Sequence, residues 1–491
     1  MVMNRYRTPF CCFFMLCSVL LITSCSTNRA TGNQSFTAFM SEEEELKVGA
    51  QEHPKIVKGF GGEYQSPELQ AYVTRTGKAL AAISEVPDLP YTFTILNDEK
   101  VNAFALPGGY VYITRGLLAL AENEAEMAGV LAHEIGHITA RHSAQRHSTS
   151  VATNIGLTVL GVLGSAVGVP SGIGQAVSAG AQAVVQGYSR EQELEADMLG
   201  VRYMTRLGYS PDAMTSFFEK LDAHSKLEAK SAGREGVSHN IMSTHPRTTD
   251  RISQAIRLAK TKSVNKPIVA REAYLKQIDG LVFGDDPSQG VRKGRVFTHP
   301  GLQIQYKVPP DFVLFNSPKN VTAIGPDKSK IVFDMANPEA VRQSGSLLDY
   351  LRTKWGRNIN LRALEPLEIN GMPAATGAGR LDTADVRLIV IEGDKDKIFQ
   401  FAFITPHQST EKLSAELQRT TYSFRRISKS EANAIRPLRI RTTKVRTGDT
   451  AASLSNRLPF EKFNKEWFEL INSLEPGARL TPGQTVKIIA E

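Results

Sequence analysis

The stretch AEMAGVLAHEIGHITARH, residues 125–142, decides how the rest of the chain is organised. It contains an H-E-x-x-H motif, His-Glu-Ile-Gly-His, at positions 133–137. Histidines four positions apart lie on one face of a helix, so His133 and His137 can reach the same metal ion. Glu134 follows His133 directly and is placed to take a proton from water without being a ligand itself.

The flanking sequence predicts that this motif lies in a helix. Acidic residues precede it and basic residues follow it, as the helix macrodipole favours, and apolar residues recur on one side. The alternative is an amphipathic helix that carries two histidines by chance, so a metal site requires a third ligand elsewhere. The flanking charged residues are Glu122, Glu124, Glu126, Arg141, His142 and Arg146.

The segment SREQELEADMLGVRYMTRLG, residues 189–208, supplies a candidate for that third ligand. Ser189 followed by Gln192 is a capping-box start for a helix. Glu193 and Asp197 are four positions apart and therefore share a face of that helix. We predict that Glu193 is the third ligand and that Asp197 orients an imidazole. The alternative is a solvated acidic face, because two further glutamates lie nearby.

Three motifs in sequence, AHEIGHITARH, SREQELEADMLG and STHPRTTDRI, resemble the signature set of one group of zinc metallopeptidases. That group contains the HtpX and CAAX-prenyl proteases (gluzincins), and the resemblance is to its BepA-like periplasmic lipoprotein subgroup. It covers about residues 41–260. It implies one zinc ion (Zn2+) per chain, held by His133, His137 and Glu193, with Glu134 as the general base.

The same resemblance assigns positions to the other site residues. It maps the acidic residue of the second motif to Asp197, the His-Pro pair to His245, and a basic residue to Arg251. We expect Arg251 to pair with Asp197 and fix the surroundings of the metal. His245 has two candidate roles, as a hydrogen-bond donor to the developing oxyanion or as a fourth zinc ligand that keeps the enzyme latent. A buried structural histidine is the third alternative.

The first 25 residues predict a lipoprotein signal peptide. Two arginines precede an apolar run at positions 10–22, which is too short to span a bilayer comfortably, and Ile-Thr-Ser-Cys at 22–25 resembles a bacterial lipobox. All four cysteines lie in this segment, so we expect a single lipidated cysteine, Cys25, and no disulfide. The alternative is an uncleaved anchor. We expect attachment to the outer membrane on its periplasmic side, followed by a tether at residues 26–40.

Residues 110–114 precede the motif helix and alternate as a strand after Gly108-Gly109. This strand could form a sheet edge on which an extended peptide adds a strand, and an ordinary structural hairpin is the alternative.

A long stretch without acidic residues, lysine or arginine, within residues 148–188, separates the two ligand-bearing segments. It has three interpretations: a membrane-dipping hairpin, a lid over the cleft, or packed core helices. Pro170 and the neighbouring glycines interrupt any single span, so we favour a lid over membrane contact.

The C-terminal part of the chain predicts two further domains. Residues 261–295 are linker-like, and residues 296–428 combine short strands with helices in an α+β pattern. His299 and His407 are isolated there, so we expect a substrate-recruiting or partner-binding domain, with plain structural packing as the alternative.

Residues 429–443 form a basic segment that predicts a solvated linker. Residues 444–491 resemble a divergent lysin motif with βααβ order, on the basis of Gly448-Asp449-Thr450, Asn472 and Pro482-Gly483-Gln484. That resemblance makes peptidoglycan a candidate ligand, and protein contact is the alternative.

We therefore predict a multidomain fold. A mainly α-helical zincin (α+β) protease domain at residues 41–260 precedes an α+β sheet domain and a small βααβ lysin-motif-like domain. The net charge of +8 comes without any nucleic-acid-binding motif, so no nucleic acid partner is expected. The predicted function is zinc-dependent cleavage of unfolded or misassembled envelope proteins by the set Glu134, His245, Asp197 and Arg251. The alternative is a lipoprotein scaffold or chaperone with minor proteolysis, and peptidoglycan hydrolysis is weaker because the motif order is that of peptidases.

Overall fold

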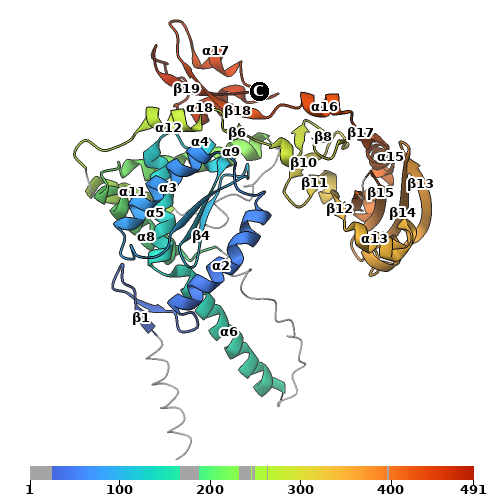
Figure 1. The fold of residues 1–491 in the computed structure, drawn as a ribbon, viewed down its shortest axis with the longest axis horizontal. Coiled ribbons are helices and arrows are strands. Elements are labelled where there is room, and N and C mark those ends of the chain that lie inside the picture. The colour runs from blue at the N-terminus through green and yellow to red at the C-terminus, as the bar shows by residue number, and fades with distance from the viewer. Residues whose placement is uncertain (1–24, 166–186, 232–244, 246–248, 262–263, 395–396) are drawn as a thin grey trace, which may run out of the picture. The chain divides into compact units, whose positions relative to one another are not determined.

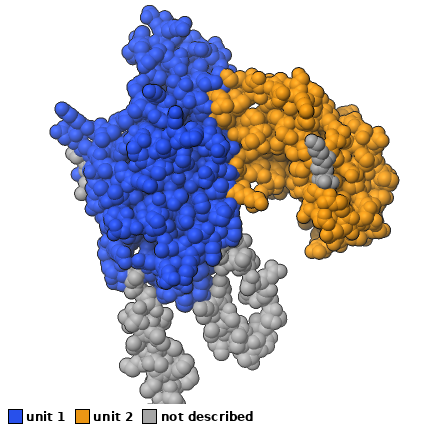
Figure 2. All heavy atoms as spheres, in the orientation of Figure 1, with its two compact units in different colours: residues 1–57, 62–281, 440–490 blue, residues 58–61, 282–439, 491 orange. Residues whose placement is uncertain are grey.

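The structure is a computed structural model that describes residues 25–165, 187–231, 245, 249–261, 264–394 and 397–491 (Figure 1). The chain forms two compact units, which Figure 2 distinguishes by colour. Unit 1 spans residues 1–57, 62–281 and 440–490, and unit 2 spans residues 58–61, 282–439 and 491. The expected multidomain organisation, with helices and several sheets, is confirmed. The expected signal peptide, residues 1–24, lies outside the described residues.

Unit 1 begins with a small hairpin of β1 (Cys25–Thr27) and β2 (Gln34–Phe36), which pair antiparallel. A turn closes it, in which the Gly32 N–H donates to the Asn28 carbonyl at 2.8 Å and Gly32 adopts a φ of +77°. The structure thus differs from the tether expected at residues 26–40, because backbone pairing and burial of Asn28 and Ala30 fold this segment.

The sheet of unit 1 has the order β3-β5-β4, from β3 (Thr92–Leu96), β4 (Ala103–Leu106) and β5 (Tyr110–Thr114). Strand β3 runs parallel to β5, and β4 runs antiparallel to it. The expectation that residues 110–114 form a sheet edge is wrong, because β5 has a hydrogen-bonded neighbour on both sides. Strand β4 is an edge instead, and it packs on the motif helix.

Helices enclose this sheet and carry the ligand candidates (Figure 1). The predicted motif helix and the predicted helix at residues 189–208 are both present. The helices are α2 (Glu42–Gly59), α3 (Pro67–Ala82), α4 (Arg115–Leu120), α5 (Glu124–Thr139), α6 (His142–Ser165), α8 (Arg190–Arg206), α9 (Asp212–Ser231), α11 (Thr249–Thr261) and α12 (Arg271–Ile278).

The stretch without charged residues is described only in part. Its first part belongs to α6, while residues 166–186 lie outside the described residues, so the choice between lid and membrane contact is not tested there. Within the part of the chain that the structure describes, no helix combines the length and apolarity needed to cross a membrane.

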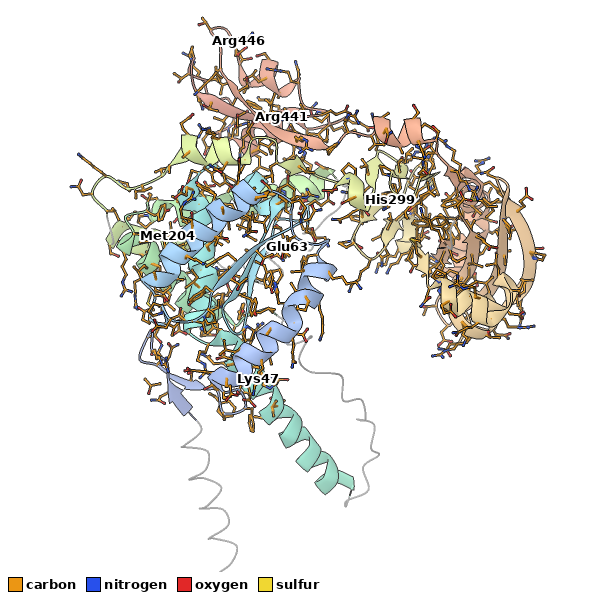
Figure 3. All side chains as sticks on the ribbon, in the orientation of Figure 1. Lys47, Glu63, Met204, His299, Arg441 and Arg446 are labelled. Atoms are coloured by element: carbon orange, nitrogen blue, oxygen red, sulfur yellow. The ribbon has the colours of Figure 1, made fainter. Side chains whose placement is uncertain are left out.

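Glycines bring α5 and α8 into close contact. A Cβ at Gly136 would lie 3.0 Å from the Ala196 carbonyl oxygen, and a Cβ at Gly200 would lie 3.2 Å from the His133 nitrogen. Met204, labelled in Figure 3, fills the space beside Gly129 further along the same interface. This close approach places the side chains of the two helices around one point.

Residues 440–490 belong to unit 1. The strand–helix–helix–strand order that the sequence predicted for residues 444–491 is present, but its first strand begins at Leu438, before the predicted start. Residues 429–443, expected to be a linker, instead form a short helix and most of a strand in which Ile440 is fully buried. That strand, β18, is central in the sheet β19-β18-β6. The elements are α16 (Lys429–Ala434), β18 (Leu438–Lys444), α17 (Ala451–Ser455), α18 (Asn464–Ile471), β19 (Thr485–Ala490) and β6 (Val282–Phe283).

Unit 2 is an α+β domain built on a seven-stranded antiparallel sheet of order β10-β11-β12-β16-β15-β14-β13. A four-stranded sheet, β17-β9-β8-β7, packs with it around a cluster of phenylalanines. His299, labelled in Figure 3, accepts the Leu302 N–H at the end of β8. The strands are β7 (Val291–Lys293), β8 (Val296–His299), β9 (Ile304–Lys307), β10 (Val313–Asn316), β11 (Val321–Ile324), β12 (Lys330–Ala336), β13 (Arg362–Ile369), β14 (Met372–Arg380), β15 (Asp385–Glu392), β16 (Ile398–Thr405) and β17 (Arg425–Arg426).

The helices of unit 2 flank the seven-stranded sheet. The longest of them, α15, contributes Leu413 to the phenylalanine cluster. The helical segments are η1 (Pro287–Gln289), η2 (Pro326–Lys328), α13 (Pro338–Ser344), α14 (Leu347–Tyr350), η3 (Leu351–Trp355) and α15 (His407–Ser423).

Candidate metal centre

Helix α5 brings the two motif histidines together. Its start is fixed by Asn123, whose side chain accepts the Glu126 N–H at 2.9 Å. One turn separates His133 and His137, and their Nε2 atoms lie 3.0 Å apart. Both side chains are buried, so the imidazoles face a point that solvent barely reaches.

Helix α8 adds the carboxylate of Glu193, as the sequence predicted. The helix begins with the predicted capping box of Ser189 and Gln192, which sets its first turn. The Glu193 carboxylate then lies 3.6 Å from His133 Nε2 and 3.5 Å from His137 Nε2. Its side chain is fully buried.

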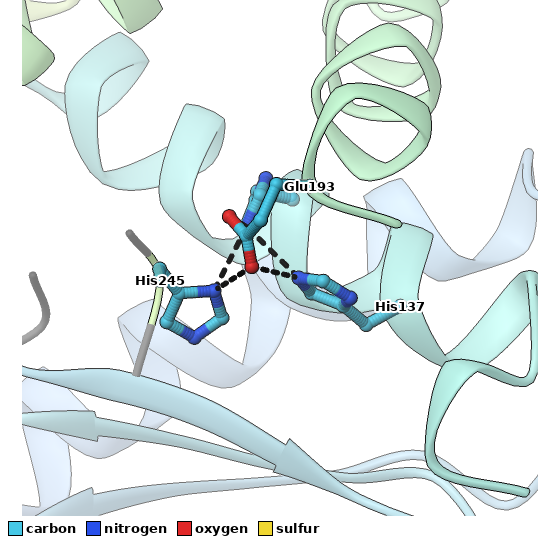
Figure 4. A group of neighbouring side chains, drawn as sticks. His137, Glu193 and His245 are labelled. Atoms are coloured by element: carbon cyan, nitrogen blue, oxygen red, sulfur yellow. Dashed lines mark hydrogen bonds and ion pairs between the residues drawn. The ribbon is translucent and has the colours of Figure 1, made fainter. Parts of the chain in front are cut away.

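His245 is the fourth member of this cluster. Its Nδ1 lies 2.9 Å from Glu193 Oε1 and 3.3 Å from His133 Nε2. Figure 4 shows the rings of His245 and His137 converging on the Glu193 carboxylate. The cluster consists of four residues: His133, His137, Glu193 and His245. One ligand atom from each of them lies within 4.8 Å of the other three.

The donor set fits zinc. Three imidazole nitrogens and one carboxylate oxygen, all within 4.8 Å of one another, can be ligands of one tetrahedral ion. Without a cation, the Nε2 atoms of His133 and His137, only 3.0 Å apart, would be crowded unfavourably by further hydrogen-bond acceptors. A bound cation satisfies all four atoms at once.

Electrostatics in the cluster favour ligand protonation states. Burial alone would raise the pKa of Glu193, but His245 and His137 beside it hold that pKa well below its ordinary range. Burial keeps the pKa of His137 well below 6.5. The carboxylate is therefore ionised and the His137 imidazole neutral, which is the form in which both bind zinc.

Asp197 and Arg251 form the pair that the sequence predicted. Arg251 Nε donates to Asp197 Oδ2 at 2.8 Å, and its NH2 donates to Oδ1 at 2.7 Å. Asp197 Oδ1 also lies 2.9 Å from His133 Nδ1, so it orients that imidazole from behind. Burial would raise the pKa of Asp197, but Arg251 and His133 lower it.

Glu134 forms no hydrogen bond with any of these residues. Its carboxylate is fully buried, and neither oxygen has a hydrogen-bond partner among the described residues. The nearest imidazole atom of His245, Nε2, is 3.5 Å from Oε1. Burial raises the pKa of Glu134, which is the shift expected of a general base that works near neutral pH.

Sequence reasoning missed a group of residues that support His137. His137 Nδ1 lies 2.8 Å from His142 Nδ1, and His142 Nε2 lies 2.9 Å from Glu195 Oε2. If His137 binds metal through Nε2, its Nδ1–H donates to His142, which then donates to Glu195. The ring of Tyr188 stacks on His137 with centroids 3.7 Å apart. The sequence showed that His142 follows His137 closely, but it did not show that the His142 side chain points toward His137.

The N-terminal hairpin extends this support. The Asn33 side chain donates to Glu195 Oε1 at 3.3 Å, and Asn28 donates to the Ala140 carbonyl at 3.4 Å. Arg202 donates to the Ala30 carbonyl at 2.9 Å. The segment that follows the expected lipid attachment point is therefore bonded to helices on both sides of the metal centre.

A small apolar cavity of about 30 Å³ adjoins His133. Phe217, Phe218 and Leu221 from α9 and Val130 from α5 line it. A cavity of this volume has room for about one water molecule.

Comparison with known proteins agrees with this site. Residues 67–259 match the family described as Peptidase family M48. The chain is 33% identical over 231 residues to the beta-barrel assembly-enhancing protease of Yersinia pestis, covering 45% of this chain and 46% of that protein. It is 31% identical over 185 residues to the mitochondrial metalloendopeptidase OMA1 of Schizosaccharomyces pombe, covering 37% of this chain and 50% of that protein.

The beta-barrel assembly-enhancing protease of Escherichia coli K12 is 29% identical over 218 residues, covering 43% of each chain. This chain thus spans half or less of the length of these curated relatives. M48 peptidases use zinc, and the buried four-residue cluster can bind a metal ion. Both findings support a zinc metalloprotease, and they confirm the resemblance at the level of the M48 family.

Proposed function

We propose that this protein is an envelope-located zinc endopeptidase that hydrolyses peptide bonds of misassembled or unfolded envelope proteins. The observation that carries this proposal is Glu134, a buried carboxylate without a hydrogen-bond partner among the described residues, beside four converging ligand atoms. The names of the bacterial relatives, beta-barrel assembly-enhancing proteases, support the substrate class and the envelope location.

The residues divide the chemistry among themselves. His133, His137 and Glu193 would hold the zinc ion, and Asp197 with Arg251 keeps His133 in its orientation. Zinc, when bound, polarises a carbonyl and acidifies water. Glu134 accepts a proton from the attacking water and returns it to the leaving amine. Burial raises its pKa, which makes its carboxylate a better acceptor of the proton from water.

His245 controls access to the site in this proposal. Its Nδ1 lies 2.9 Å from Glu193 Oε1 and 3.3 Å from His133 Nε2, so His245 could supply the fourth ligand that a catalytic zinc site otherwise leaves to water or substrate. We infer that this arrangement is latent and that His245 must leave before substrate enters. His245→Ala then raises activity several-fold, whereas a sharp fall would support a role as oxyanion donor instead.

The edge strand β4 gives a binding site for an extended substrate. Strand β4 packs on α5, and an extended peptide can add to its edge through backbone hydrogen bonds. This predicts cleavage of extended, unfolded chains.

Lipid attachment through Cys25 and peptidoglycan binding by residues 444–491 complete the proposal. The lipobox-like sequence supports outer-membrane anchoring. Substituting Cys25→Ala should release the protein from the membrane fraction. Pull-down on purified peptidoglycan tests the second contact, and a failure to bind would favour a role in protein contact.

The decisive experiment joins metal analysis to cleavage. The purified protein should hold one zinc per chain and cleave an unfolded envelope protein, and a chelator should abolish this. Glu134→Gln should remove cleavage while zinc content stays at one. If Glu134→Gln still restored the cellular function of a deletion strain, the scaffold or chaperone alternative would be correct and the protease proposal wrong.

A further inference from the structure

Unit 2 contains a cavity of about 640 Å³ on one face of its seven-stranded sheet. Strands β13, β14, β15 and β16 form the floor, and α15 forms a wall. This volume is in the range of ligand-binding pockets. The family match ends at residue 259, before this part of the chain.

The lining of this groove combines apolar side chains with polar and charged ones. Thr376 and Ile389 are cross-strand neighbours, as are Ile389 and Phe401, so side chains in this register share the face that carries the phenylalanine cluster. Leu417 and Tyr422 contribute from α15. Tyr422 is 48% exposed although it is large and aromatic, which leaves part of this wall open to solvent.

Three arginines lie at the open part of the groove. The register pairs Arg362 with Ala378 and Ala378 with Arg387, and Arg380 is two positions beyond Ala378 on the same face. All three arginines line the cavity. Alternate residues of a strand face the same side of the sheet, so the side chains of these three arginines point into the same cavity.

The lining carries three arginines against two carboxylates, and Arg387 donates a hydrogen bond to Thr376 Oγ1 at 3.3 Å. Arg362 has no ion pair among the described residues, and the contact of Arg380 with Asp385 is long, at 3.9 Å. Asp385 already accepts from Thr410 at 2.7 Å and contacts His407 at 3.0 Å. Glu365 is the other acidic residue of the lining, so cationic groups are in excess.

We propose that this groove binds an extended polypeptide segment in which acidic side chains stand next to an aliphatic or aromatic one. The arginines would pair with the acidic side chains, and Ile389, Phe403 and Leu417 would cover the apolar one. This inference rests on the proposed function, because it makes unit 2 a recruiting domain for unfolded protein substrates.

Hydrogen-bonding groups along the groove favour a peptide over a lipid. Ser414 and Gln418 of α15 stand among the apolar side chains of the lining and can pair with the amide groups of a polypeptide backbone, whereas Thr376 and Thr405 already form hydrogen bonds within the unit. An acyl chain could pair with neither Ser414 nor Gln418, which is unfavourable in a covered site. An inorganic anion would leave the apolar floor uncovered.

The test measures binding by the full-length chain carrying Glu134→Gln, so that the probe is not cleaved. The probe is a fluorescent twelve-residue peptide in which Glu and Asp alternate with Phe and Leu. The variant Arg362→Gln/Arg380→Gln/Arg387→Gln should weaken its binding at least tenfold. Replacing Glu and Asp of the peptide by Gln and Asn should weaken binding to the parent chain similarly, and added salt should do the same.

The matched control removes three exposed lysines of unit 2 that do not line the groove, Lys319, Lys330 and Lys354, each replaced by Gln. It loses the same charge and should bind the peptide as the parent does. Equal binding by the groove variant and the control would overturn the proposal. Binding of vesicles with anionic lipid or of inorganic phosphate to the groove, without binding of the peptide, would also overturn it in favour of those ligands.

The outcomes separate this inference from the proposed function. If the chain binds the peptide in the groove but the unsubstituted chain cleaves no unfolded protein, the protease proposal fails while the groove stands. If cleavage is zinc-dependent but the peptide does not bind, the groove proposal fails alone. The groove variant should keep its rate on a short neutral peptide and lose rate only on acidic unfolded proteins.

Discussion

Helix α5 carries a group of buried charges at each end, and the two groups are balanced differently. At its N-terminal end, Lys487 Nζ lies 3.1 Å from Glu122 Oε2, and Lys220 Nζ lies 2.7 Å from Glu126 Oε2. Arg271 also pairs with Glu122. Glu124 accepts hydrogen bonds from two tyrosine hydroxyls. The charges of this group therefore cancel, because three carboxylates are balanced by three cations. The carboxylates are those of Glu122, Glu124 and Glu126, and the cations are Lys220, Arg271 and Lys487.

The charges of the metal centre, around the second half of the helix, do not cancel in this way. Glu134, Glu193 and Asp197 are three buried carboxylates, and Arg251 is the cation within hydrogen-bond reach of two of them. The group carries a formal charge of −2 when its histidines are neutral. A divalent cation would neutralise it. The difference teaches that a charge deficit, rather than the number of buried charges, marks the functional end of the helix.

The substitution Glu134→Gln should have the largest effect of those that test this contrast. It removes the general base and should lower the cleavage rate about a thousandfold. It also removes a buried carboxylate that lacks a hydrogen-bond partner among the described residues, so the metal-free protein should become more stable. Cleavage assays and urea unfolding in chelator measure the two results.

A useful control for this prediction is Glu126→Gln, at the balanced end of the same helix. It leaves Lys220 without its carboxylate and should lower the free energy of unfolding. If both substitutions destabilised the metal-free protein equally, the two ends of the helix would not differ in the way that we infer.

The substitution Lys487→Met should have the next largest effect. Lys487 comes from the last strand, β19, is fully buried, and donates to the carbonyl of Ala121 at 2.7 Å. Its loss leaves Glu122 with one cation fewer and should lower the free energy of unfolding by about 3 kcal/mol. Urea unfolding measures this. Lys444→Met, on an exposed lysine of β18, should change it little, and an equal loss there would argue against a specific role of Lys487.

Local patterns in the sequence predicted much of the metal centre. The spacing of His133 and His137, the capping box at Ser189 and the position of Glu193 each depend on residues within a single helix, where periodicity is reliable. The βααβ order expected within residues 444–491 is also found, but its first strand, β18, lies mostly in residues 429–443, which were expected to be a linker.

Contacts between distant parts of the chain could not be predicted in this way. Lys487 meets Glu122 across more than 360 positions, and nothing local in the last strand identifies that partner. The basic residues around β18 suggested a linker, because the burial of Ile440 becomes evident only when β19 and β6 are placed beside it. The groove in unit 2 depends in the same way on the register of four strands.

The substitution His142→Ala tests whether the hydrogen bonds behind the metal ligands hold these ligands in place. His142 connects His137 to Glu195 and should act as a positioning residue. Its loss should weaken zinc affinity tenfold to a hundredfold, as competition with a chromophoric chelator measures. His147→Ala, one turn further along α6, should leave zinc affinity unchanged. His142→Gln, which keeps a polar side chain, should restore part of the affinity, and unchanged affinity in His142→Ala would refute the role.

The pH dependence of stability should show the smallest effect, and it isolates Lys487. Burial lowers the pKa of Lys487 from 10.5 to about 8, against the opposing effect of Glu122. Between about pH 8 and 10.5 the folded chain has released this proton while the unfolded chain still holds it. The unfolded state then binds more protons, so this group makes stability rise with pH by at most about 1.4 kcal/mol per unit.

Below about pH 8 the lysine is charged in both states and contributes no pH dependence. The difference in unfolding free energy between the parent chain and Lys487→Met should therefore be flat up to about pH 7.5 and widen from pH 8 to 9.5. Urea unfolding at half-unit intervals measures it. Parallel profiles for the two chains would mean that Lys487 keeps its proton throughout, and that Glu122 and the carbonyls around it compensate its charge fully.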